Sequence, residues 1–239
     1  WVRGETERLA APLSAEDQVV QSMPDASPTK WHRAHVTWFF ETMILRAFAP
    51  GYEPLDPHYL FLFNSYYDAV GARHPRPARG LLTRPTADQV KAYRAHVDDA
   101  MRALINDADD ATWEKVAPMI ALGLHHEQQH QELILMDILH AFSHNSVAPA
   151  YQTYRAAPAR KTPELRWFDH DGGLVEIGHA GAEFAFDNEG PRHSVHLAPF
   201  RLASRLVTNG EWKEFMADDG YARPELWLSD GWAAVGAEG

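Results

Sequence analysis

The 239-residue sequence contains no cysteine, which excludes disulfides, thiolate metal ligands and a cysteine nucleophile together. No hydrophobic run approaches the roughly 20 residues of a membrane span, and no signal-peptide pattern opens the chain, so we expect a cytoplasmic protein with no membrane partner. Positive charge is also scarce. The 22 Lys and Arg residues against 33 Asp and Glu give a formal net charge of −11, which argues against nucleic-acid binding.

The residues that are present suit a globular chain. At 45% hydrophobic and 23% charged, the protein can bury a core. It has 14 histidines, so a metal site would use imidazole and carboxylate ligands, and any sulfur chemistry would use sulfur brought by a substrate. The chain begins with Trp1 and stops at Gly239 without a closing element, so we expect a piece of a longer protein or one whose ends are missing.

The first 145 residues have the inventory of a four-helix bundle. A short helical segment covers residues 2–13. Ser27 is expected to cap the next helix, with Pro28 at its first position and a long apolar run behind it. Thr86–Gln89 forms a capping box for another helix, and a further long helix is expected from about Thr112 to Ser143.

Two proline-rich stretches interrupt these elements. Residues 63–86 should form an irregular connection, and residues 148–165 a linker to a second domain. Beyond the linker, residues 172–178 and 193–203 are expected to form strands, and Thr208 to cap a helix through Phe215. The fold class is therefore α+β, with a helical bundle over 1–147, a linker over 148–165 and the beginning of a second domain over 166–239.

The stretch "HHEQQHQE" (residues 125–132) carries the most specific chemistry. His126 and His130 are four residues apart, so on a helix both imidazoles share one face and can bind one ion; Gln129 leans to the same side. The same letters spell the HExxH motif of zinc peptidases, with Glu127 as base. The glycine and histidine of the metzincin extension are missing, because Leu133 and Met136 stand there, so the peptidase interpretation is disfavoured.

A third ligand is expected upstream, at His35. This histidine shares a helical stripe with Trp31, Trp38, Thr42 and Leu45, which should face the bundle interior. Bundles commonly build metal sites from facing helices. His32, on a different face, is the fallback.

Three neutral imidazoles suit iron(II) as well as zinc, and ligand type does not choose between them. His140 and His144 continue the later helix roughly 15 Å beyond His130, too far to share its site. We expect both to be structural or surface residues, with Asp137 pairing locally with His140.

Three segments together resemble the non-haem iron sulfoxide synthases of ergothioneine biosynthesis: Ser27–Glu41, Phe63–Gly80 and His126–His140. Those enzymes join a DinB-like bundle to a formylglycine-generating-enzyme-like domain (a C-type-lectin-like α+β fold), whose opening is similar to residues 184–216. The resemblance implies that the chain holds a DinB-like bundle and an incomplete second domain. We also expect the segment Phe186–His193 to pack near the bundle.

The resemblance further implies an activity and its ligands. His35, His126 and His130 would hold iron(II), and the substrates would be hercynine (trimethylhistidine), cysteine or γ-glutamylcysteine, and dioxygen. The family's catalytic tyrosine would lie beyond residue 239, so the piece alone is expected to lack a full active site. Glu127 would support the helix or the metal ligands rather than act as a peptidase base.

Substrate contacts are expected in the connection and on the later helix. Tyr66 and Tyr67 offer aromatic faces to a quaternary ammonium group. Arg76 and Arg79 offer forks for amino-acid carboxylates and are predicted to bind the thiol substrate. Gln129 is included among the predicted substrate contacts because it shares the helix face of His126.

Three alternatives stay open. A DinB-type zinc-dependent thiol transferase or hydrolase would use the same three histidines, but would consume no oxygen. A non-enzymatic metal-binding module would hold an ion without a substrate-sized cleft. An ovothiol-type synthase would act on unmethylated histidine in place of hercynine.

Overall fold

The computed structural model describes residues 1–239 except 66, 154, 157, 159–160 and 239. The chain divides into two compact units, Trp1–Ala156 and Ala157–Gly239. The first is helical, and the second contains short strands and helices, so the fold is mixed α+β as predicted. Among the described helices, none combines the length and the apolar character needed to cross a membrane.

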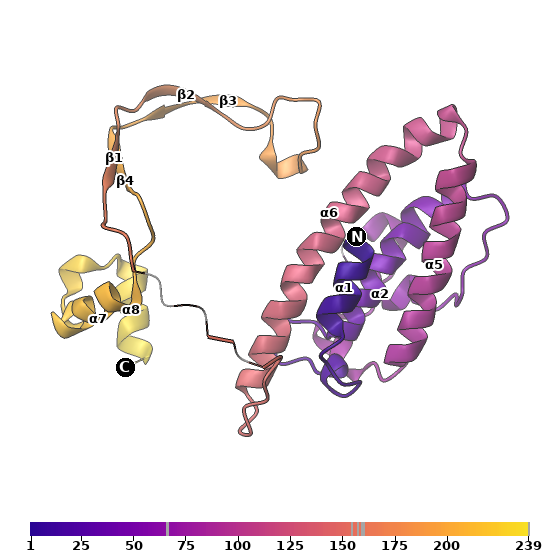
Figure 1. Cartoon of the computed structure of the whole chain (residues 1–239), viewed down its shortest axis with the longest axis horizontal. Coiled ribbons are helices and arrows are strands. Elements are labelled where there is room, and N and C mark those ends of the chain that lie inside the picture. Colours follow the sequence, from indigo (N-terminus) through magenta and orange to yellow (C-terminus); the bar gives the residue numbers. More distant parts are fainter. Residues whose placement is uncertain (66, 154, 157, 159–160, 239) are drawn as a thin grey trace. The chain divides into compact units, whose positions relative to one another are not determined.

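Four helices of the first unit pack against one another as the expected bundle, namely α1, α2, α5 and α6 (Figure 1). The long helix predicted from about Thr112 begins two residues earlier, and the predicted capping box at Thr86 is present. The helices of this unit are α1 (Val2–Ala10), α2 (Thr29–Phe40), α3 (Arg46–Phe48), α4 (Tyr59–Leu62), α5 (Ala87–Asp107) and α6 (Asp110–Ser143).

The start of α2 differs from the prediction. Pro28 is the extended residue that precedes the helix, and Ser27 makes no capping hydrogen bond. The polar groups of Ser27 serve tertiary contacts instead: its N–H donates to Asp137 Oδ2 (2.8 Å), and its hydroxyl accepts from Arg79 Nη1 (2.9 Å). Ser27 therefore fixes the entry to α2 by joining it to two other elements.

The end of α2 passes through a π-helical turn, Glu41–Leu45, before α3. Glu41 is buried, and its carboxylate accepts hydrogen bonds from the hydroxyls of Tyr52 and Tyr93, both at 2.6 Å. Burial and the Glu41 carboxylate raise the pKa of both tyrosines. The carboxylate thus ties the end of α2 to α5 and to the segment after α3.

The predicted interior stripe of α2 is confirmed for Trp31, His35, Trp38 and Leu45, all of which are at most 2% exposed, while Thr42 is half-buried. These residues belong to a core that α5 completes. The buried core residues of α5 are Val90, Tyr93, Val97, Met101 and Leu104.

The apolar residues on either side of the histidine motif would suggest that α6 is largely buried, but its burial is one-sided. Only one face of this helix is buried, and Met136 (57%) and Leu139 (58%) are exposed on another. Helix α6 approaches α2 closely at Gly123, where a Cβ atom would lie 2.8 Å from the Phe40 ring. The apolar residues that flank the histidine motif are therefore no evidence that the whole helix is buried.

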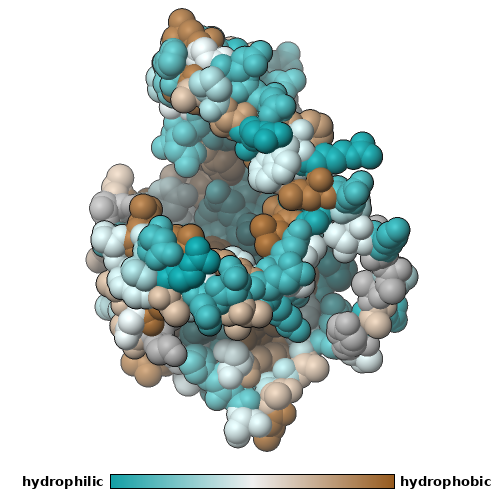
Figure 2. Space-filling view, turned by 90° about the vertical axis from the view of Figure 1, so that its left-hand side faces the viewer, coloured by the Kyte–Doolittle hydropathy of each residue, from teal (hydrophilic) through white to brown (hydrophobic). Residues whose placement is uncertain are grey.

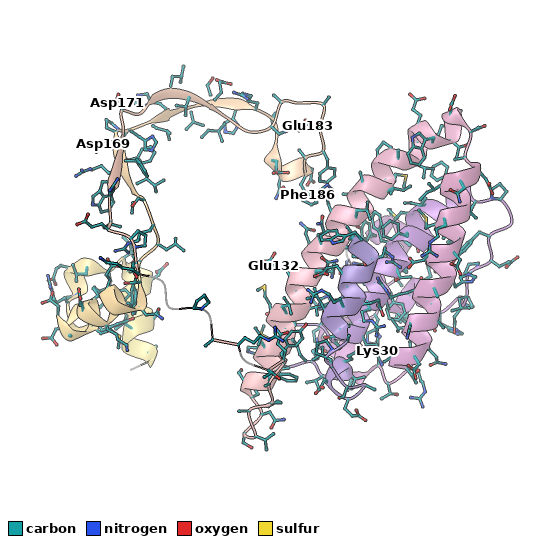
Figure 3. All side chains as sticks on the ribbon, in the orientation of Figure 1. Lys30, Glu132, Asp169, Asp171, Glu183 and Phe186 are labelled. Carbon is teal, nitrogen blue, oxygen red and sulfur yellow. The ribbon has the colours of Figure 1, made fainter. Side chains whose placement is uncertain are left out.

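The connection between α4 and α5 is irregular, as predicted, and holds two short 3₁₀ turns, Asp68–Val70 and Arg76–Leu81. A side chain of α2 holds this connection in place. Lys30, labelled in Figure 3, donates from Nζ to the carbonyl of Leu82 at 2.7 Å. The connection is therefore held beside the same helix that carries His35.

The second unit contains two antiparallel ribbons, β1 paired with β4 and β2 paired with β3 (Figure 1). The sequence predicted the other strands but missed β1, whose four side chains are all exposed and show no alternation of burial. The capping box at Thr208 is present, and its helix runs two residues further than predicted. The elements are β1 (Trp167–His170), β2 (Gly173–Ile177), β3 (His193–Leu197), β4 (Phe200–Ala203), α7 (Asn209–Ala217) and α8 (Ser229–Glu238).

Many hydrophobic side chains of the second unit are exposed. Leu174, Leu206 and Leu228 are 74%, 89% and 87% exposed. Hydrophobic residues lie among hydrophilic ones on the surface shown in Figure 2. Polar pairs on the ribbons are exposed too, as for Asp169 on β1 (Figure 3), which lies 2.7 Å from Arg201 on β4.

Candidate metal centre

The three histidines singled out in the sequence meet between α2 and α6. His35 on α2 and His126 and His130 on α6 each offer a ring nitrogen, and the three atoms lie within 4.8 Å of one another. Nε2 of His35 is 3.2 Å from Nε2 of His126. Because α2 and α6 approach closely at Gly123, the side chains of His126 and His130, three and seven residues further along α6, can reach the stripe of α2.

His35 is held by two tryptophan rings and a backbone carbonyl. Its ring is sandwiched between Trp31, stacked at 4.6 Å and 11°, and Trp38, stacked at 5.6 Å and 15°. Its Nδ1–H donates to the carbonyl of Phe63 at 2.6 Å, because a carbonyl can only accept. Nε2 is then the unprotonated nitrogen, and it faces the other two histidines.

All three rings favour the neutral form. Burial lowers the pKa of His126 to about 4. Burial, with neighbouring imidazoles as a second cause, places the pKa values of His35 and His130 well below the ordinary range. Neutral imidazole is the form that binds a metal ion, so the desolvation that disfavours protonation prepares these nitrogens as ligands.

The donor set fits a divalent transition metal. Two nitrogens bound at about 2.1 Å to one ion lie about 3.0–3.4 Å apart at tetrahedral or octahedral angles. The 3.2 Å between Nε2 of His35 and Nε2 of His126 falls in that range. Nδ1 of His126 is buried without a hydrogen-bond partner among the residues that the structure describes. Three imidazoles would leave coordination positions open, as both iron(II) and zinc sites of this kind require.

His32 lies beside the cluster, although the sequence placed it on a different face. Its Nδ1 is 2.8 Å from Nδ1 of His130, and its Nε2 is 2.9 Å from Oδ2 of Asp137. Asp137 therefore pairs with His32 on α2. The prediction that it would pair locally with His140 is wrong. The i, i+3 spacing of His32 and His35 was a signal that could have found this contact, since residues three apart on a helix are neighbours.

Glu127 points away from the histidines, into the packing of α1 against α5 and α6. It is fully buried, and its carboxylate accepts from Thr6 Oγ1 (2.6 Å), Arg3 Nη1 (2.8 Å) and Arg94 Nη2 (2.8 Å). Burial alone would raise the pKa of Glu127, but Arg3 and Arg94 lower it, so the carboxylate is charged. A peptidase base would have to face the metal, so this geometry leaves Glu127 a role in holding the helices.

The predicted aromatic and amide contacts differ in their placement. Tyr66 lies outside the described residues. The ring of Tyr67 is half-buried and lies 5.4 Å from Trp38, one of the two rings that stack on His35. Gln129 is exposed on α6. Only Tyr67 of these three is therefore placed by the structure next to a neighbour of the histidines.

The two predicted arginines lie on one 3₁₀ turn, Arg76–Leu81. Arg79 is buried, with its guanidinium 3.4 Å from the centre of the Trp31 ring and Nη2 3.1 Å from the hydroxyl of Ser65. Arg76 donates to the carbonyl of Asp25. Arg79 thus packs against Trp31, the same ring that stacks on His35.

His140 and His144 lie apart from the cluster, as predicted. Nδ1 of His140 is 2.7 Å from the hydroxyl of Ser22, and Nε2 of His140 is 3.3 Å from Nε2 of His144. They form a local pair at the end of α6.

Comparison with known proteins agrees with this architecture. Residues 1–134 match the DinB superfamily, and residues 156–238 match the sulfatase-modifying factor enzyme 1-like domain. The chain is 31% identical over 216 residues to a protein named hercynine oxygenase from Mycobacterium tuberculosis, covering 87% of this chain and 47% of the relative.

Proteins of the same name from two Mycolicibacterium species are similar to the same degree. The one from M. thermoresistibile is 32% identical over 220 residues (88% of this chain, 45% of the relative). The one from M. smegmatis is 32% identical over 219 residues (89% and 48%). The chain spans about half the length of these relatives. It belongs to the DinB superfamily, and the resemblance predicted from its three segments, a DinB-like bundle followed by a sulfatase-modifying-factor-like region, is confirmed.

Proposed function

We propose that the protein is an oxidoreductase of the hercynine oxygenase kind, an iron(II)- and dioxygen-dependent sulfoxide synthase. It would join hercynine to the sulfur of cysteine or γ-glutamylcysteine. One imidazole C–H and one thiol S–H are lost, a C–S bond and an S=O bond form, and dioxygen is reduced by four electrons to the sulfoxide oxygen and one water. The observation that carries the proposal is the convergence of His35, His126 and His130 in a chain similar to three proteins of that name.

The three imidazoles would hold the ion from one side. Bound there, iron(II) supplies open positions at which a thiolate and dioxygen can meet. The protein contributes neutral ligands, because burial keeps the three rings unprotonated. The absence of cysteine means that no thiol of the chain itself competes with the substrate for the metal.

The substrates would be oriented by the connection before α5. Tyr66 and Tyr67 are proposed to face the quaternary ammonium of hercynine, and the placement of Tyr67 beside Trp38 supports this. Arg76 and Arg79 are proposed to receive the carboxylates of the thiol substrate. Gln129, exposed on the ligand-bearing helix, is proposed as a further polar contact.

Oxygen consumption by the full-length protein tests this function. Protein loaded anaerobically with iron(II) should consume dioxygen when given hercynine together with a thiol, and mass spectrometry should find the sulfoxide. His130→Ala should abolish turnover because it removes a ligand, whereas His144→Ala, in the separate pair, should not change it.

Three results would contradict the proposal. Undiminished turnover in His130→Ala would remove the metal site from the reaction. Thiol transfer that needs zinc and no oxygen would favour the DinB-type transferase. A preference for histidine over hercynine would favour the ovothiol-type reaction.

A further inference from the structure

A chain of three polar side chains runs from the surface of α6 back to the metal-facing histidine. Asp137 Oδ2 lies 2.9 Å from His32 Nε2, and His32 Nδ1 lies 2.8 Å from His130 Nδ1. His32 is buried, at 2% exposed, and the Asp137 side chain is 14% exposed. The two contacts join α2 to α6 immediately behind His130.

The positions of the protons in this hydrogen-bonded series follow from which groups can donate and which can only accept. An ionised carboxylate only accepts, so His32 Nε2 carries the hydrogen that points at Asp137. A neutral His32 then has no hydrogen on Nδ1 and must accept there. His130 therefore donates from Nδ1, and its Nε2 is left without a proton.

The neighbouring contacts agree with this order. Ser27 N–H donates to the same Oδ2 of Asp137 at 2.8 Å, which holds the carboxylate in place as an acceptor. At another ring of the cluster, the Phe63 carbonyl accepts the Nδ1 hydrogen of His35 at 2.6 Å, so Nε2 of His35 carries no proton. Two independent acceptors, a carboxylate acting through a second imidazole and a backbone carbonyl, thus set two of the three rings in the same protonation pattern.

We propose that Asp137 and His32 are positioning residues that hold the proton of His130 on Nδ1 and thereby direct a bare Nε2 at the metal. The inference rests on the proposed metal site, since it assigns a task at that site to residues outside the three ligands. Partners of this kind fix ring orientation and raise ligand basicity, and their loss typically costs about 10- to 100-fold in metal affinity.

Two substitutions separate the contribution of His32 to metal affinity from that of the Asp137 charge. His32→Phe keeps a ring of similar size next to Trp31 but offers His130 no acceptor, so iron(II) affinity should fall about 10- to 100-fold. Asp137→Asn can place its carbonyl oxygen where Oδ2 stands and accept from both Ser27 and His32. It keeps the proton order and loses only the charge, so its loss should be smaller than that of His32→Phe.

The test combines a direct view of the ring with a binding measurement. Nitrogen-15 NMR of the metal-free protein should show His130 protonated at Nδ1 and bare at Nε2. Anaerobic competition between the protein and a chromogenic chelator, with iron(II) and separately with zinc(II), should rank the variants as above. His140→Phe, the same change in the separate pair of α6, should bind metal as the unchanged protein does.

Either measurement can overturn the inference. A proton on Nε2 of His130 in the metal-free protein, or metal affinity within twofold of the unchanged protein in His32→Phe, contradicts it. If His32→Phe does not fold, judged by near-UV circular dichroism, the NMR spectrum of the unchanged protein still decides. If the unchanged protein binds no metal, the proposed function fails, while the NMR result still shows whether the proton order exists.

Discussion

The two units of the chain use similar local signals and reach different degrees of burial. Each contains a helix begun by a Thr capping box, at Thr86 and at Thr208, and each contains an Arg–Glu pair with an N–O distance of 2.8 Å. In the first unit, the pair between Arg94 and Glu127 is almost completely buried. No described hydrophobic side chain of the second unit is fully buried. Local sequence therefore forms the elements, and only packing against further layers gives them a core.

The two-stranded ribbons of the second unit explain why its side chains are exposed. Each consists of two strands, and a two-stranded ribbon alone is at best marginally stable in water. Phe168 on β1 is 57% exposed, although a strand in a packed sheet would bury one face. By contrast, α2 is buried along its whole length between its neighbours. We therefore expect the helical unit to be more stable than the second unit, although both form regular secondary structure.

Amide hydrogen exchange should reveal the largest difference. Amides in the middle of α2 are expected to exchange only on global unfolding, whereas those of the β2–β3 ribbon should exchange through local opening. With an unfolding free energy of at least about 5 kcal/mol for the bundle, the α2 amides should exchange at least about a thousandfold more slowly. Similar protection in both units, measured by mass spectrometry on peptic fragments, would mean that the second unit has a stable core of its own.

The paired charges should give the next largest difference. Glu127→Gln removes a buried charge that Arg3 and Arg94 require, and breaking a buried pair of this kind costs about 3–5 kcal/mol of unfolding free energy. Glu211→Gln breaks the pair with Arg205 in the second unit, where the two side chains are 36% and 17% exposed, so a much smaller change is expected there. Urea denaturation of the metal-free protein, followed by tryptophan fluorescence, measures both. An equal effect of the two substitutions would show that the burial difference does not govern stability.

The same contrast explains how much the sequence could predict. The ligand candidates His126 and His130 follow from their spacing on one helix, and His35 from a hydrophobic stripe, because both patterns are local and periodic. The caps at Thr86 and Thr208 are equally local, and both are present. Where a pattern repeats within one helix, the sequence alone predicts which residues share a face of that helix.

Contacts between elements were harder to predict. The pairing of Asp137 with His32 joins residues 105 positions apart, and local spacing suggested His140 as the partner instead. Strand β1 was missed because all four of its side chains are exposed, so no alternation marks it. Met136 and Leu139 are apolar yet exposed, so apolar character alone does not show which residues of α6 are buried. In each case the deciding fact is which surface another element covers.

The matched capping boxes should give the smallest difference and the most direct test of the comparison. In both, the Thr hydroxyl accepts from the backbone N–H three residues later, and the Gln or Glu there accepts from the Thr backbone N–H. Replacing such a cap with alanine costs about 1 kcal/mol. Because α5 belongs to the cooperative bundle, Thr86→Ala should lower its unfolding free energy by that amount.

Thr208→Ala should leave the unfolding free energy of the bundle unchanged, because α7 belongs to the other unit. Its effect should appear locally, as about fivefold faster amide exchange within α7, since 1 kcal/mol corresponds to roughly that factor in an opening equilibrium. A fall in the stability of the bundle on Thr208→Ala would show that the two units unfold together. The capping hydrogen bonds of α5 and α7 would then contribute to one cooperative unfolding transition. The difference in burial between the two units would not determine their stability.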